Sequence, residues 1–128
     1  MQLNSSIPGD AMKLQVRYHN IGDKSRAERE LRRQTAKLKR HLKKFSPDLV
    51  DLHVSLEREK RPTNPFEASL ALHLPPGQLH ARETAPDELA ALKYAFAELW
   101  REIKKMKAKL QRKTERRRSS PRRPTVPV

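Results

Sequence analysis

The sequence predicts an α+β fold with the element order β-α-β-β-β-α, in which a four-stranded mixed sheet carries two helices on one face. Four segments alternate apolar and polar residues, which is typical of strands that bury one face. Two longer segments repeat apolar residues at steps of three and four, which is typical of helices with a single apolar stripe. Elements with one apolar face each are buried most simply as two layers, with both helices on the same side of the sheet.

The first strand is predicted over residues 12–19, and a helix is predicted to follow it from Ser25 to about Phe45. Ser25 and Glu28 match the S-x-x-E pattern of a capping box, in which each side chain accepts a hydrogen bond from a free backbone amide at the helix start. Pro47 should stop the helix, because proline cannot continue the backbone hydrogen bonding.

Three further strands are predicted over residues 50–57, 66–74 and 78–84. A polar loop with two prolines, residues 58–65, separates the first two, and Pro75-Pro76-Gly77 is a tight reversal before the last. We expect these three strands to form an antiparallel meander. The strand–helix–strand unit before them should be a right-handed parallel crossover.

The last helix is predicted from Asp87 to Lys113 and carries the longest apolar stripe. The stripe consists of Leu89, Leu92, Phe96, Leu99, Ile103, Met106 and Leu110. We expect it to pack on the inner face of the sheet, formed by Leu14, Val16, Leu52, Val54, Leu70 and Leu72. The opposite side of the helix becomes more basic along the chain.

Composition divides the chain into three parts: a flexible lead (1–11), a folded domain (12–112) and a disordered basic tail that contains proline (113–128). The net charge of +14 over 128 residues points to a polyanionic partner, with nucleic acid as the leading case. The absence of cysteine excludes disulfides and thiolate sites. Neither a membrane span nor a secretory signal is found, so we expect a cytoplasmic protein that does not bind membranes.

Dense basic residues on both predicted helices are the candidate RNA-binding surface. Because no acid lies among the lysines from Lys104 to Lys109, a merely solvated face is the weaker interpretation. Lysine suits phosphate contacts, whereas aromatic residues, at 5%, are too few for a platform on which bases stack. The candidates on the two helices and their ends are Lys37, Arg40, Lys44, Arg101, Lys104, Lys105, Lys107 and Lys109. Arg82, on the outward side of the last predicted strand, is a further candidate.

Other polar groups have simpler structural interpretations. The outward histidines His53, His73 and His80 are scattered polar residues of a wet sheet face rather than a metal site. Glu98 and Glu102 are ion-pair partners for neighbouring cations rather than an acid–base pair. Trp100 is a partly buried packing residue. No catalytic motif is found, so we expect neither an enzyme nor a cofactor.

Several segments together resemble the ribosome hibernation-promoting factors, also called ribosome-associated inhibitor or sigma-54 modulation proteins. The segment from Leu72 to Ala81 resembles the family's strand, Gly-containing turn and strand with [IL]-H-A. Asp87 with Ala90-Ala91-Leu92 resembles the start of its last helix, and Arg101 with Lys105 to Leu110 resembles that helix's basic end. The Lys/Leu-rich helix end from Lys37 to Phe45 is also similar. The likeness covers about Met12 to Gln111.

The resemblance implies a protein that binds the small ribosomal subunit and its rRNA in the groove used by messenger and transfer RNA, and thereby blocks translation. The chain resembles a short form without the family's dimerising domain, so we expect a monomer that does not pair ribosomes by itself. Two alternatives stay open. One is a general RNA- or DNA-binding module of the nucleoid type, and the other is a protein-interaction adaptor that uses the open sheet face.

Overall fold

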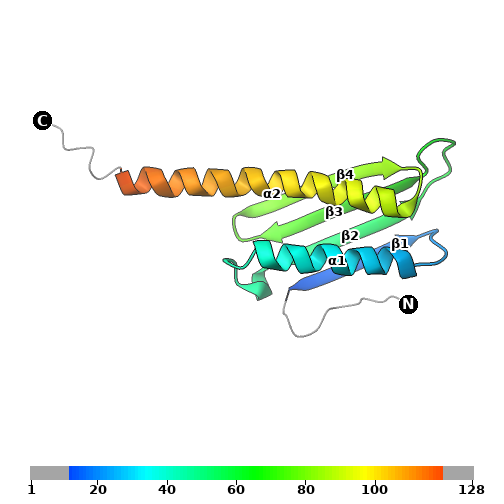
Figure 1. The fold of residues 1–128 in the computed structure, drawn as a ribbon, viewed down its shortest axis with the longest axis horizontal. Coiled ribbons are helices and arrows are strands. Elements are labelled where there is room, and N and C mark those ends of the chain that lie inside the picture. Colours follow the sequence, from blue (N-terminus) through cyan, green and yellow to red (C-terminus); the bar gives the residue numbers. More distant parts are fainter. Residues whose placement is uncertain (1–11, 120–128) are drawn as a thin grey trace, which may run out of the picture.

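A computed structural model describes residues 12–119 of the chain, and of residues 114–119 it describes the backbone alone. The predicted lead, residues 1–11, and residues 120–128 of the predicted tail lie outside the described residues. The observed element order is β-α-β-β-β-α, with one short 3-10 helix added before the second strand. The predicted α+β fold is therefore confirmed (Figure 1).

The four strands form one mixed sheet in the spatial order β1-β2-β3-β4. They are β1 (Lys13–His19), β2 (Asp51–Arg58), β3 (Phe66–Leu74) and β4 (Gly77–Ala85). The strands β1 and β2 are parallel, whereas β3 is antiparallel to both β2 and β4. Leucines lie opposite one another across the whole sheet, in the row Leu14, Leu52, Leu72 and Leu79. This register gives the sheet a continuous apolar face.

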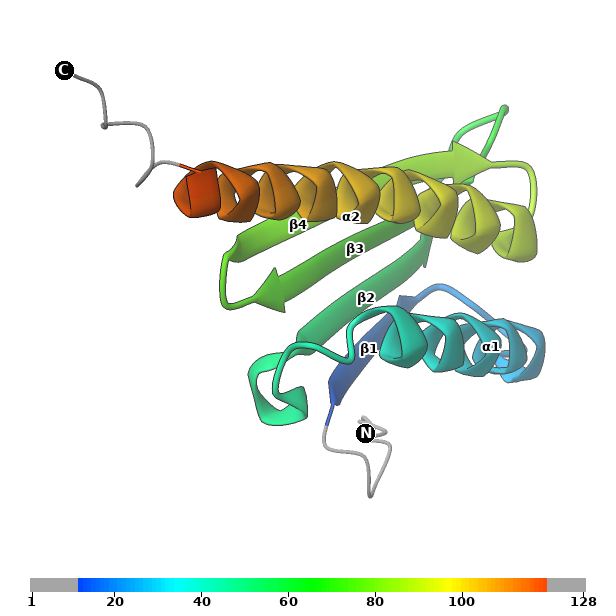
Figure 2. The ribbon, with the colours of Figure 1, turned by 60° about the vertical axis from the view of Figure 1, so that its left-hand side comes forward.

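Both helices lie on this apolar face, side by side and running in the same direction (Figures 1 and 2). They are α1 (Ser25–His41) and α2 (Glu88–Ser119), and the 3-10 helix η1 (Pro47–Leu49) follows α1. The helix α2 contacts β3 and β4, while α1 covers the β1 side of the sheet. Of the six residues predicted to lie beneath α2, Leu70 and Leu72 belong to β3, one of the two strands that make the main contacts with α2.

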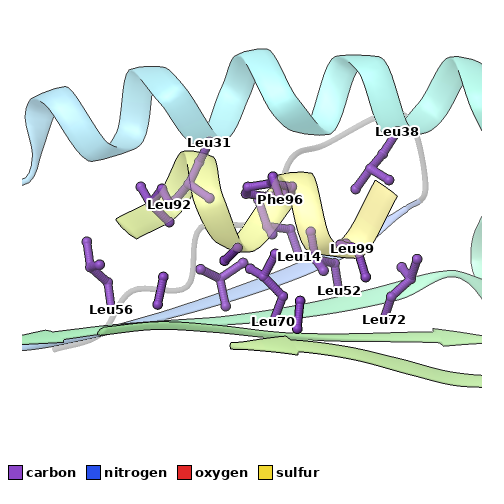
Figure 3. Close-up of a cluster of buried hydrophobic side chains, with 14 of the residues drawn as sticks. Leu14, Leu31, Leu38, Leu52, Leu56, Leu70, Leu72, Leu92, Phe96 and Leu99 are labelled. Carbon is purple, nitrogen blue, oxygen red and sulfur yellow. The ribbon is translucent and has the colours of Figure 1, made fainter. Parts of the chain in front are cut away.

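The core lies between the two helices and the sheet (Figure 3). Leu31 and Leu38 enter it from α1, and Leu92, Phe96 and Leu99 enter it from α2. All five side chains are buried, and Phe96 is 0% exposed. The core therefore fixes where α1 and α2 stand relative to each other.

The predicted capping box at the start of α1 is wrong. The backbone N–H and the hydroxyl of Ser25 both donate to Oδ1 of Asp23, at 3.0 and 2.8 Å, and the N–H of Glu28 donates to the carbonyl of Lys24. The helix thus begins one residue earlier than a capping box at Ser25 requires, because the aspartate competes for the same amide. The bonds from Ser25, backbone first and side chain second, lower the pKa of Asp23.

Both helix ends differ from the predicted ones. The helix α1 ends at His41, and Phe45 instead donates its N–H to the carbonyl of Leu42 in a tight turn. Ser46, which precedes Pro47, is extended, as steric contact with the proline ring requires. The helix α2 runs to Ser119, so its predicted end at Lys113 is wrong. No Gly or Pro lies between Lys113 and Ser119, and Arg and Glu favour the helix.

The buried position of Phe96 leads to a test of the core. We expect Phe96→Ala to lower the free energy of unfolding by about 3–5 kcal/mol, because it removes a ring that fills the space between α1, α2 and the sheet. Urea denaturation measures this change. Tyr94→Ala on the same helix is the control, since Tyr94 is 52% exposed and should cost far less. Equal losses of stability in the two variants would contradict the packing.

The contact of Asp23 with Ser25 leads to a pH-dependent test. The pKa of Asp23 is lowered in the folded state, so its ionised form stabilises the fold above the carboxyl's unfolded pKa. This contribution is lost as the pH falls through the folded pKa. We expect Asp23→Ala to reduce the thermal midpoint at neutral pH and to match the wild type in strong acid, as followed by circular dichroism. A difference that persisted unchanged in acid would refute the cap.

Candidate nucleic-acid interface

The two helices meet at a polar junction around Trp100. Its indole Nε1 donates to Oε1 of Gln34 over 3.5 Å, and its ring meets the ring of His41 edge-on with centroids 4.9 Å apart. The ammonium of Lys37 lies 5.5 Å from the centroid of the indole. We call this junction, formed by Gln34, Lys37, His41 and Trp100, the seam. Trp100 is partly buried and packs against the core, which confirms its predicted packing role.

A buried carboxylate holds the α1 side of the seam in place. Glu30 is 8% exposed, and it accepts a hydrogen bond of 2.8 Å from Nε2 of Gln34. Arg33 donates to both oxygens of Glu30, at 3.0 and 3.2 Å. Burial alone would raise the pKa of Glu30, but the bonds from Gln34 and Arg33 and the charges of Arg33 and Lys93 outweigh it and lower the pKa. The ionised carboxylate therefore orients Gln34 toward Trp100.

The basic residues of α2 divide between two sides of the helix. Three lysines share the side of Trp100 that faces α1. Lys93 precedes Trp100 by seven residues, Lys104 follows it by four and Lys107 by seven, and these spacings place residues on one side of a helix. We call these three lysines and Lys37 of α1 the seam cations. Among the described residues, no ion pair joins any seam cation to an acid, although the charge of Lys93 acts on Glu30.

The other side of α2 mixes cations with acids. Arg101 bonds Glu98 at 2.5 Å, and Lys105 lies 3.6 Å from Glu102. Both glutamates are thus ion-pair partners of neighbouring cations, as predicted. The hydrogen bond and the charge of Glu98 raise the pKa of Arg101. These pairs reduce the positive charge that Arg101 and Lys105 offer to a ligand.

The remaining helix-side candidates are exposed. Arg40 lies in the last turn of α1, three residues after Lys37. Lys44 lies in the turn beyond the end of α1, and Lys109 lies on α2 four residues after Lys105. Lys37, Arg40, Lys44, Arg101, Lys104, Lys105, Lys107 and Lys109 thus all belong to the helix layer. Sequence reasoning missed Lys93, which its spacing from Trp100 could have identified.

Arg82 lies on the opposite face of the sheet. It is an outward residue of β4 and pairs with Glu67 of β3. Glu67 faces outward on the same side of the sheet, yet it is only 7% exposed, because the side chain of Arg82 covers it. Glu67 also raises the pKa of Arg82, first through the hydrogen bond and then through its charge. The structure therefore separates Arg82 from the other eight candidates.

The histidines of the open sheet face make local contacts. His53 lies 3.2 Å from Asp51, and its ring meets that of His73 edge-on at 5.0 Å. His80 lies 3.0 Å from the side chain of Gln78. In the described part of the chain, no three His, Cys, Asp or Glu residues gather where they could hold a metal ion. Nor does any helix there have the length and apolar character needed to cross a membrane.

Comparison with known proteins agrees with this fold. The N-terminal domain of Protein Y from Thermus thermophilus superposes with a TM-score of 0.60 at 18% identity, over 74% of this chain and 97% of that one. A search of curated proteins finds no match. The sequence model of the sigma 54 modulation protein / S30EA ribosomal protein family matches residues 14–111. Because this match spans most of the chain, the protein belongs to the sigma 54 modulation protein / S30EA ribosomal protein family.

Proposed function

We propose that this protein silences ribosomes by binding the rRNA of the small subunit in the decoding region, where it excludes messenger and transfer RNA. One observation carries the proposal: two parallel helices lie on one face of the sheet and place the seam cations side by side without acids paired to them. Membership of a family described as an S30EA ribosomal protein supports the ribosome as the partner.

The chemistry of the seam suits RNA backbone. Phosphates are bound well by lysine point charges, which need no fixed two-point geometry. The ring of Trp100 is already engaged by Gln34 and His41, so it supports the seam rather than offering a free face to a base. A folded RNA with closely spaced phosphates fits a row of cations on two neighbouring helices.

To inhibit translation in this way, the protein needs only to occupy its binding site on the small subunit. The sheet and core hold the helices as one layer, and α2 extends past the end of the sheet (Figure 1). A rigid body that fills the path of messenger and transfer RNA blocks both without chemistry. We therefore propose a monomeric, non-catalytic factor without a cofactor, which acts in the cytoplasm and contacts no membrane.

Charge removal tests the seam. We expect Lys104→Gln with Lys107→Gln to weaken binding to purified small subunits and to make log Kd less dependent on log salt, by about 0.7 for each phosphate that is no longer neutralised. The control is Lys13→Gln with Arg17→Gln on the open sheet face, which changes the net charge equally. Filter binding over a range of salt measures both. Identical weakening in the two double variants would contradict a specific seam.

The stoichiometry of inhibition tests the assignment to ribosomes. A factor that occupies the decoding region should inhibit cell-free translation at about one protein per ribosome. A general nucleic-acid binder would need a large excess, because it distributes over all RNA present. Titration of the protein into a translation extract, with ribosomes counted, separates the two. Inhibition that follows total RNA rather than ribosome concentration would contradict the proposal.

A further inference from the structure

An open cleft lies at the end of the sheet away from the C-terminus of α1. It has a volume of about 1200 Å³ and is bordered by the loop between β1 and α1 and by the loop between β2 and β3. Both loops follow strands that are parallel, so they meet at the same end of the sheet. The main lining residues are Tyr18, Asn20, Lys24, Arg58, Lys60 and Arg61.

The loops that form the cleft are fixed by backbone contacts. The N–H of Glu59 donates to the carbonyl of Pro65 at 2.7 Å and closes the base of the second loop. Asn64 in that loop and Asn20 in the first loop both have left-handed backbones, with φ of 49° and 61°. The side-chain amide of Asn20 lies 3.5 Å from the carbonyl of Arg58 and joins the first loop to the end of β2, where the second loop begins. The shape of the cleft is therefore fixed by hydrogen bonds and by the backbone conformation of its two loops.

The lining of the cleft is strongly basic. It contains four cations and one acid, Glu59. Lys24 lies over the ring of Tyr18 at 5.2 Å, and Arg58 lies over the ring of Phe66 at 5.6 Å, so two cations are held by aromatic rings that leave their charge uncompensated. Lys60 and Arg61 are exposed, and neither has an ion-pair partner within the described residues.

Tyr18 adds a polar group without a partner. Its hydroxyl is buried and makes no hydrogen bond within the described part of the chain. Burial, followed by the charge of Glu28, raises the pKa of Tyr18 to about 12, so the hydroxyl keeps its proton at neutral pH. The hydroxyl can donate a hydrogen bond, but because it is buried, an anion in the cleft would reach it only after a local shift of the lining.

We propose that this cleft binds backbone phosphates of an RNA strand at a second site, separate from the seam. The inference rests on the proposed function in taking RNA as the partner. The cleft is larger than the usual 300–1,000 Å³ of small-molecule pockets, which favours an extended ligand. Protein partners are held chiefly by buried aromatic anchors, whereas the exposed groups here are the charged ends of Lys60 and Arg61.

The second site reaches a different part of the RNA from the seam. Lys24 precedes α1, while Lys37 and His41 lie in its last turns. The 17 residues of α1 span about 25 Å. A single RNA segment that touched both the cleft and Lys37 would have to run along most of α1.

Neutralising the two exposed cations tests the cleft. We expect Lys60→Gln with Arg61→Gln to make the salt dependence of small-subunit binding less steep by about 1.4, the change expected when two phosphates are no longer neutralised. Lys13→Gln with Arg17→Gln changes the net charge equally and should leave the slope near that of the wild type. A cleft variant that matched this control would overturn the second site. That result would leave the proposed binding of the wild-type protein to small subunits unaffected.

Tethered cleavage identifies what occupies the cleft. Because the chain has no cysteine, Thr63→Cys and Ala108→Cys each give one attachment point for an iron chelate that cleaves nearby RNA. On small subunits, we expect both positions to cut rRNA, at separate nucleotides. Cuts from position 108 alone, or cleavage only of ribosomal proteins from position 63, would overturn the cleft proposal. Absence of cuts from both positions would count against the proposed function as well.

Discussion

Trp100 is held between α1 and α2 by Gln34, which is itself oriented by the buried carboxylate of Glu30. The basic surface is arranged around this contact, because it lies where the core brings α1 and α2 together and marks the side of each helix that faces the other. A buried acid is costly unless its oxygens are satisfied, and here Gln34 and Arg33 satisfy them. Because hydrogen bonds are directional and apolar packing is not, the contact helps to orient the two helices relative to each other.

The same contact explains how the charges of α2 are sorted. Within the described residues, the cations on the side of Trp100 have no paired acid, whereas the opposite side holds Glu98 and Glu102 with their cations. A helix with cations all around would repel itself along its length. Placing the acids away from the seam relieves that repulsion and leaves the seam positive. Stability and ligand binding are therefore served by different sides of one helix.

Much of the fold could be predicted because each element has one apolar face. Period-two alternation located all four strands to within a residue of their ends, and the stripe through Phe96 located the last helix. Helix ends were less predictable, since Asp23 and Ser25 are both good caps and only the backbone path decides between them. The seam could not be predicted from the sequence, because its residues come from two helices whose relative position only the structure gives. The alternation of the last strand already placed Arg82 on the outward side, but its pairing with Glu67 of the neighbouring strand could not be predicted from sequence.

We propose that the helix layer binds the decoding region of the small subunit. A chemical footprint of small-subunit rRNA, taken with and without one equivalent of the protein, tests it most directly. We predict protection confined to nucleotides of the decoding region, in the path of messenger and transfer RNA. Protection spread over the rRNA without preference, or confined to a site outside that path, would contradict the claim.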